Sequence, residues 1–121
     1  MNKQILIAAV VVAALGAACK SGNPNLRNEI SAKIASTQPA IQKCYQNILY
    51  TNRKVRGMMV LQMAANAEGQ FIDVNTLRDE PANPVLRYCV VQELGKLRLD
   101  KPPGKRVDIT SVPVRFDWSN P

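Results

Sequence analysis

The chain has 121 residues, 46% of them hydrophobic, and a formal net charge of +7. This length suits a single small domain with one core. The sequence has no histidine, and its Lys and Arg residues are scattered without a run. We therefore expect no metal, no cofactor and no nucleic-acid partner.

Residues 1–18 have the three parts of a bacterial signal peptide. Lys3 supplies the early positive charge, an apolar run extends from Ile5 to Leu15, and small residues follow at positions 16–18. The apolar stretch of residues 5–18 is shorter than the roughly 20 residues that a membrane-spanning helix needs. We therefore predict a signal peptide that is cleaved before Cys19.

Cys19 is the first of three cysteines. In an exported chain two cysteines can pair as a disulfide, so the third one needs another role. We predict that it is lipidated and anchors the protein to a membrane, with residues 19–25 as a short tether. Leu15 stands four residues before Cys19, whereas a lipobox has Leu three residues before. Simple cleavage after Ala18, giving a soluble periplasmic or secreted protein, is the alternative. Lys20, in place of Asp, favours the periplasmic face of the outer membrane.

Residues 26–51 have the apolar period of a helix, and Cys44 and Tyr45 lie on its apolar face. Pro39 interrupts this pattern because it lacks a backbone donor and crowds the preceding turn. Thr37 either caps a second helix or lies at a kink in one continuous helix.

Residues 57–77 are typical of a β-hairpin. Residues 57–65 form an apolar run without clear alternation, which suits a central strand, and residues 66–69 form a turn in which Gly69 supplies a positive φ. In the second strand we expect Phe71, Asp73 and Asn75 on one face and residues 72, 74 and 76 on the other.

A second helix begins after Asn83, a favourable N-cap followed by Pro84, and ends near Gly95. Cys89 lies on its apolar stripe. The last strand covers residues 107–118. Pro113 indicates that this strand lies at a sheet edge or has its unpaired side at that point, because proline cannot donate a ladder hydrogen bond. We expect an α+β fold for residues 26–118: a kinked N-terminal helix followed by ββαβ, with a three-stranded antiparallel sheet and both helices on one face.

With both helices on the same sheet face, Cys44 and Cys89 come close together. A structural disulfide between them would stabilise the fold by about 3–4 kcal/mol. Two buried free thiols and a redox dithiol are the alternatives. The redox role lacks a Cys-x-x-Cys motif and a neighbouring histidine.

No set of residues in the sequence indicates an enzyme, and we assign no catalytic residue. Asp79 and Glu80, with Asp73 nearby, are expected in a solvated turn, without an accompanying nucleophile or base. Tyr45 and Trp118 are expected to pack in the core rather than form a binding platform.

The edge of the last strand offers backbone donors and acceptors that an extended peptide can join. Protection of this edge by Pro113 and nearby charges is the alternative. The residues that we assign to partner binding are Val107, Ile109, Thr110, Val112, Val114 and Phe116.

Several of these features together resemble the TonB C-terminal-like domain of the AgmX/PglI type. They are Cys44-Tyr45, Gly57 at the start of an apolar strand, Glu68-Gly69 in a hairpin, Cys89, and a final strand at residues 112–116. The resemblance covers about residues 27–118. It implies a periplasmic domain whose last strand, residues 107–116, pairs with a short peptide of a partner.

We therefore expect a non-enzymatic cell-envelope lipoprotein that docks an envelope protein or an extended peptide by strand addition. A self-associating structural protein, or a component of a motility, secretion or transport assembly, is the alternative. TonB-type energy transduction is less favoured, because a cleaved signal and a tether of residues 20–25 do not span the envelope.

Overall fold

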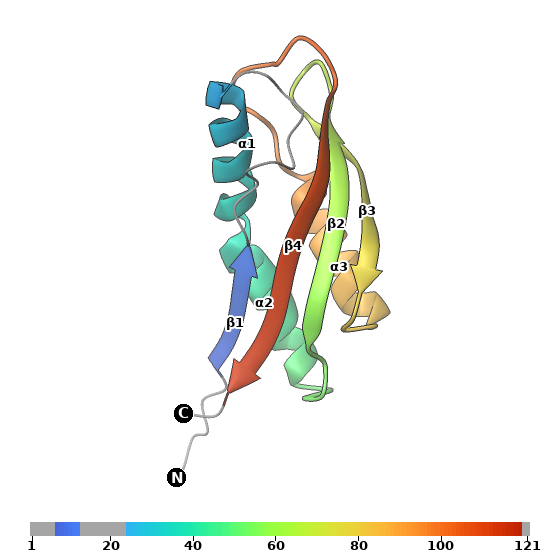
Figure 1. The fold of residues 1–121 in the computed structure, drawn as a ribbon. Coiled ribbons are helices and arrows are strands. Elements are labelled where there is room, and N and C mark those ends of the chain that lie inside the picture. The colour runs from blue at the N-terminus through green and yellow to red at the C-terminus, as the bar shows by residue number, and fades with distance from the viewer. Residues whose placement is uncertain (1–6, 13–23, 120–121) are drawn as a thin grey trace.

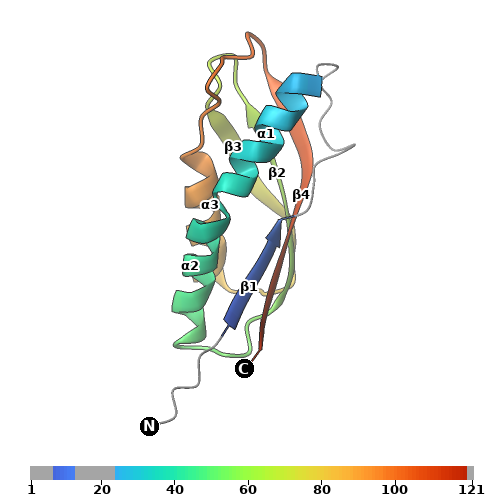
Figure 2. The same ribbon diagram turned by 90° about the vertical axis from the view of Figure 1, so that its left-hand side faces the viewer.

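The computed structural model describes residues 7–12 and 24–119. Its elements follow the order β1 (Ile7–Val12), α1 (Pro24–Ser36), α2 (Gln38–Leu49), β2 (Gly57–Ala65), β3 (Phe71–Asp79), α3 (Pro84–Gly95) and β4 (Val107–Ser119). Strands β2, β3 and β4 form an antiparallel sheet with β2 in the centre. Figures 1 and 2 show the helices on one side of this sheet. The predicted α+β class is confirmed.

Strand β1 adds a fourth strand that the sequence analysis did not anticipate. The sheet order is β1-β4-β2-β3, and β1 runs antiparallel to β4. Its six residues, IAAVVV, come from the segment predicted to be the apolar part of a signal peptide. Valine and isoleucine favour extended backbone, so this run suits a strand when a sheet edge is available. The predicted cleavage itself stays a prediction.

The N-terminal helix bends at Thr37. This residue has helical backbone angles (φ −82°, ψ −7°), and its hydroxyl makes no capping bond to α2. It donates instead to the Ile34 carbonyl at 2.5 Å, back into α1. Pro39 lies in the first turn of α2, where a missing N–H is tolerated. The structure therefore favours the kinked helix over a separately capped second helix.

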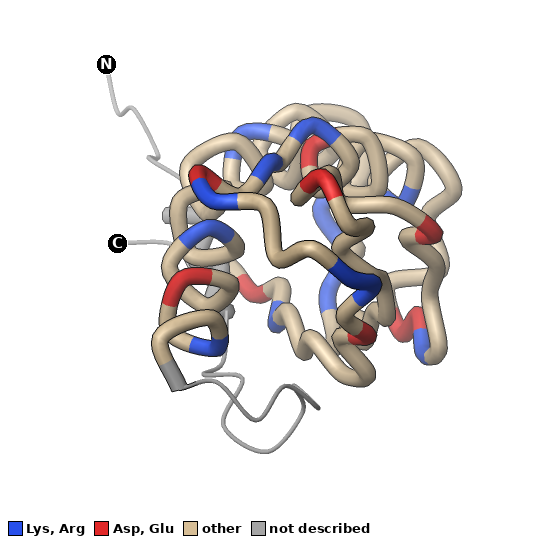
Figure 3. The backbone as a smooth tube through the Cα atoms, turned by 90° about the horizontal axis from the view of Figure 1, so that it is seen from above, with Lys and Arg blue, Asp and Glu red and all other residues tan. Residues whose placement is uncertain are grey.

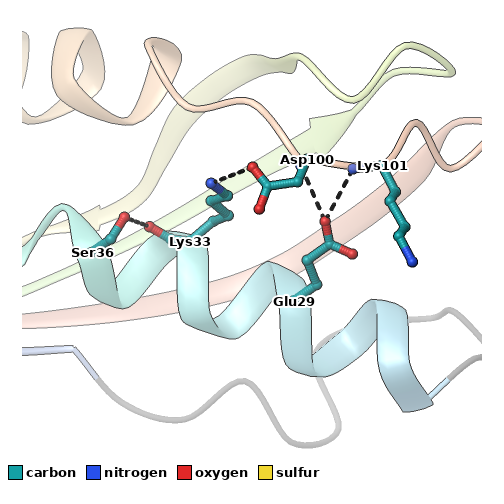
Figure 4. A network of polar contacts seen from close by, with 5 residues as sticks. All are labelled: Glu29, Lys33, Ser36, Asp100 and Lys101. Carbon is teal, nitrogen blue, oxygen red and sulfur yellow. Dashed lines mark hydrogen bonds and ion pairs between the residues drawn. The ribbon is translucent and has the colours of Figure 1, made fainter.

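Polar contacts fix α1 against the segment that leads into β4 (Figure 4). Glu29 Oε1 accepts from the backbone N–H groups of Asp100 and Lys101, at 3.1 and 3.3 Å. Lys33 Nζ lies 2.9 Å from Asp100 Oδ1. Figure 3 shows Lys and Arg interspersed with Asp and Glu over the described backbone, as the scattered charges in the sequence predict.

The hairpin from β2 to β3 turns as expected. Asn66 Oδ1 accepts from the N–H groups of Glu68 and Gln70, and Gly69 adopts φ +89°. In β3 the register against β2 shifts twice. Asp73 has φ +55° at one shift, where β3 carries an extra residue. The expectation that Phe71 shares a face with Asp73 and Asn75 is therefore wrong: Phe71 is buried, and the other two are exposed.

Strand β4 also contains a bulge. Leu61 lies opposite Val112 and Met63 opposite Ile109, so β4 has one residue more than β2 over this stretch. In a regular strand Ile109 and Val112, which are three residues apart, would lie on opposite faces of the sheet. With the extra residue, Val107, Ile109 and Val112 all reach the core.

The core lies between the helices and the covered face of the sheet. Tyr45 of α2 is fully buried and meets the Phe116 ring edge to face, with centroids 5.1 Å apart. Its hydroxyl donates to the Val55 carbonyl at 2.6 Å. Burial raises the pKa of Tyr45 to about 12, because the phenolate would lose its hydration.

Candidate functional site

Three features of the described chain bear on function: the disulfide, the edge of β4, and the face of the sheet opposite the helices. The disulfide joins Cys44 of α2 to Cys89 of α3, with Cα atoms 6.0 Å apart. The predicted pair is thus the bonded one, and two buried free thiols do not fit. Asn83 begins α3 as expected, since its side chain accepts from Leu86 N–H at 2.9 Å. The third cysteine, Cys19, lies outside the described residues, and its lipidation stays a prediction.

The edge of β4 holds an extended segment over residues 114–119. The register runs from Val12 opposite Val114, through Val10 opposite Phe116, to Ile7 opposite Ser119. Figure 2 shows β1 along β4 and beside α2. Pro113 directly precedes the paired stretch and faces Val60 on the β2 side. In the four-stranded sheet β4 lies between β1 and β2, so it is not an edge strand over residues 114–119. Pro113 lies just outside that stretch, where β4 pairs with β2 alone.

The side chains assigned to partner binding lie mostly in the core. Val107 is 4% exposed and Phe116 is 1% exposed, and Thr110, at the bulge, is partly exposed. The remaining three are fully buried: Ile109, Val112 and Val114. These side chains form the core under the strand, so a partner that joins the edge would pair with the backbone groups of β4.

A cavity of about 460 Å³ opens on the uncovered face of the sheet, next to the stretch of β4 that β1 joins. Three of its side chains are arginines, from the segment before β2, from β3 and from β4. The lining residues are Arg56, Gly57, Met58, Arg78, Glu80, Arg115, Phe116 and Asp117. No local pattern in the sequence indicates this cavity, because its walls come from segments far apart in the chain.

Glu80 is the fixed anion of the cavity. Its Oε1 accepts from Met58 N–H at 2.7 Å, and its other carboxylate oxygen forms an ion pair with Arg78. The Met58 N–H first, and then the Arg78 guanidinium, hold the pKa of Glu80 below its ordinary value. Gly57 allows this close approach: it has φ +129°, and a Cβ there would lie 2.7 Å from Glu80 Cβ.

The other two arginines retain their capacity to bind an anion. Arg56 places its guanidinium carbon 5.0 Å from the centroid of the Trp118 ring. Trp118 in turn donates its indole N–H to the Arg53 carbonyl at 2.6 Å and packs against the core. Arg115 is exposed. Within residues 24–119, neither Arg56 nor Arg115 forms an ion pair.

Asp73, Asp79 and Glu80 each pair with a different arginine. Asp79 bonds Arg87 of α3 at 2.7 Å, while Asp73 bonds Arg106 at 2.9 Å. The described residues contain no group of three or more side chains that could hold a metal ion. No helix within residues 24–119 is long and apolar enough to cross a membrane.

Comparison with known proteins gives no relative for this chain: no family model, no curated protein and no solved structure matches it. The resemblance to TonB C-terminal-like domains therefore stays a prediction that rests on the residues quoted for it.

Proposed function

We propose that this chain is a non-enzymatic cell-envelope lipoprotein whose single domain docks an extended segment of a partner protein on the edge of β4. The observation that carries the proposal is the pairing of β1 with residues 114–119. It supports the proposal because β1 adds to this edge as a peptide would in strand addition, through backbone hydrogen bonds.

The packing of the domain suits such an edge. The buried apolar residues within 24–119 lie on the helices, on β2, β3 and β4, and on the loops between them. The predicted removal of residues 1–18 would take β1 away and leave the edge of residues 114–119 to another strand. An open sheet edge of this kind is a template for pairing with a second chain.

The proposed compartment follows from the three cysteines. A disulfide that joins two helices favours an oxidising environment such as the bacterial periplasm. Cys19 follows a segment with the pattern of a signal peptide and is proposed to carry the lipid. Intact-mass measurement of the protein from its native host tests this part: added acyl mass on a chain that begins at Cys19 supports the anchor, and an unmodified Cys19 overturns it.

Strand addition is tested by releasing β1 in the full chain. Successive residues of a strand point their N–H groups to opposite sides, so the double change Val10→Pro and Val11→Pro removes one donor that faces β4. Amide hydrogen exchange of residues 114–119 should become faster in this variant. Adding a peptide with the sequence of Ile7–Val12, carrying a solubilising tag, should restore the protection.

The matched control is the double change Val10→Thr and Val11→Thr, which keeps both donors and the preference for extended backbone. Its exchange should match that of the unchanged protein. Exchange of β4 that responds neither to the release of β1 nor to the peptide would overturn docking at this edge. Sedimentation of the proline variant addresses the alternative function, since a stable dimer would favour self-association.

A further inference from the structure

The edge of β4 and the arginine-lined cavity are adjacent, and Arg115, Phe116 and Asp117 belong to both. The cavity lies on the uncovered face of the sheet, and the edge runs along its side. Any strand that joins β4 at residues 114–119 therefore passes this cavity.

A second hollow on the same face shows what makes the first one suited to an anion. This second hollow, about 310 Å³, contains one cation, Arg106. Arg106 bonds Asp73 and Asp108 at 2.9 and 3.0 Å, so its charge is already neutralised by the protein. In the first cavity, Glu80 forms an ion pair with Arg78 alone, and its charge also acts on Arg115 at longer range. Arg56 and Arg115 remain, with Asp117 as the second acid in the wall.

One carboxylate oxygen of Asp117, Oδ1, already accepts a hydrogen bond from Trp118 N–H at 2.8 Å. Arg56 lies over the Trp118 ring, a contact that leaves the donors of a guanidinium able to bind a carboxylate. Arg115 is held in a strand and is exposed on the cavity side. Among the described residues, Arg115 is therefore the cation best placed to meet a carboxylate that comes from the edge.

The register identifies which residue of a docked strand would reach Arg115. Residues directly opposite each other in an antiparallel pair lie on the same face of the sheet. In β1 the position opposite Arg115 is that of Val11, and the positions opposite Val114 and Phe116 are those of Val12 and Val10. The latter two positions belong to the covered face, since Val114 and Phe116 are buried there.

We propose that the partner segment of this domain carries a carboxylate side chain at the position opposite Arg115, flanked by apolar residues opposite Val114 and Phe116. This inference rests on the proposed strand addition and adds the chemistry of the partner: an extended segment of the pattern apolar–acidic–apolar. Arg115 binds the carboxylate, and Arg56 contributes a second positive charge at the same cavity. The apolar neighbours of the carboxylate lie beside the core and α2.

The experiment uses the full chain with Val10→Pro and Val11→Pro, which opens the edge. Three otherwise identical ten-residue peptides carry Glu, Gln or Lys at the position opposite Arg115, and their dissociation constants are measured by calorimetry at low salt. The Glu peptide should bind about fivefold more tightly than the Gln peptide, and the Lys peptide most weakly, as cross-strand charge pairs of this size predict. The preference should shrink as salt is added.

Arg115→Glu in the same background should reverse the order, so that the Lys peptide binds best. Arg98→Glu is the matched control, because Arg98 is an exposed arginine that does not line this cavity; it should leave the order unchanged. Equal binding of all three peptides, with β4 still protected from exchange, would overturn the carboxylate preference and leave strand addition standing. Failure of every peptide to bind or protect β4 would overturn strand addition itself.

Discussion

On the helix-covered face of the sheet, Met59 and Leu61 of β2 are fully buried, whereas Met58 and Val60 of the same strand are partly exposed on the other face. The covered face is closed by apolar contacts and by the disulfide between α2 and α3. The open face carries the arginine-lined cavity. Apolar packing and an arginine-lined cavity are thus divided between the two sides of one strand.

The same division shows in two ionisable groups. Burial raises the pKa of Tyr45 on the covered side, and the nearby positive charge of Arg56 offsets this effect only in part. Hydrogen bonds from Met58 N–H and Arg78 lower the pKa of Glu80 on the open side. The covered side therefore holds a neutral phenol, while the open side holds an ionised carboxylate. Substitutions on the covered face should alter the free energy of unfolding, and substitutions on the open face should alter the binding of a partner.

The largest expected effect is the loss of the disulfide. Replacing Cys44 and Cys89 together by Ala should lower the free energy of unfolding by about 3–4 kcal/mol, because the unfolded chain regains the freedom of a loop closed over 45 residues. Urea denaturation measures this loss. Reduction of the unchanged protein should produce a similar drop, and equal stability of oxidised and reduced protein would contradict a structural role for the bond.

Two neighbouring methionines compare the faces directly. Met59→Ala should cost about 3 kcal/mol, since it removes a fully buried side chain and leaves a cavity. Met58→Ala, on the open face, should cost less than about 1 kcal/mol. Chemical denaturation of the two variants gives both values. Equal losses would show that the open face is packed as tightly as the core.

Alkaline pH should weaken the covered side. The folded chain holds the Tyr45 proton up to a pKa of about 12, while the unfolded chain releases it near its ordinary value of 10. The contribution of Tyr45 to the free energy of unfolding is therefore fully present below pH 10. It falls by about 2–3 kcal/mol between pH 10 and pH 12. Ultraviolet titration in a Tyr50→Phe and Tyr88→Phe background isolates Tyr45. Ionisation of Tyr45 near pH 10 in folded protein would contradict its burial.

Gly57 is expected to be needed for the close approach of Glu80 at the cavity. Gly57→Ala should destabilise the protein by about 1–3 kcal/mol, because φ +129° is strained for alanine and the new Cβ meets Glu80 Cβ. Gly95→Ala is the control, since a Cβ there meets nothing within 4 Å. Thermal denaturation compares the two variants, and similar melting temperatures would argue against a tight approach at Gly57.

The smallest effect on stability should come from Glu80. Its lowered pKa means that its contribution is present above the ordinary carboxyl pKa and is lost as the pH falls through the folded value. Carbon NMR of the Glu80 carboxyl should show this low pKa. Arg78→Gln should raise it only part of the way, because the Met58 N–H continues to donate. A full return to the ordinary value would mean that the backbone bond contributes little.

The elements that the sequence predicted well are those with a local signal. The helix of residues 84–95 has its cap at Asn83 and its apolar period, and the hairpin turn has Asn66 and Gly69. The pairing of Cys44 with Cys89 followed because each helix must turn its apolar stripe to the same sheet face. Local preference and periodicity are short-range properties, so they can be derived from neighbouring residues.

The features missed by sequence reasoning depend on register between distant strands. The bulges in β3 and β4 decide which side chains reach each face, and no single residue in β4 marks the extra position. Arg56, Arg78 and Arg115 lie on three separate segments, and only strand pairing brings them to one cavity. Their spacing in the chain therefore carried no signal of a site.

The chain thus determined by itself its α+β class, the order of its helices and hairpin, and its cysteine pairing, because each follows from residues close in sequence or from the need to bury an apolar stripe. Tertiary structure alone decided that the apolar segment of β1 joins the edge of β4 and that three arginines meet beside it. Both depend on backbone hydrogen bonds between segments far apart in the chain. A local sequence pattern does not determine the register of such strand pairs.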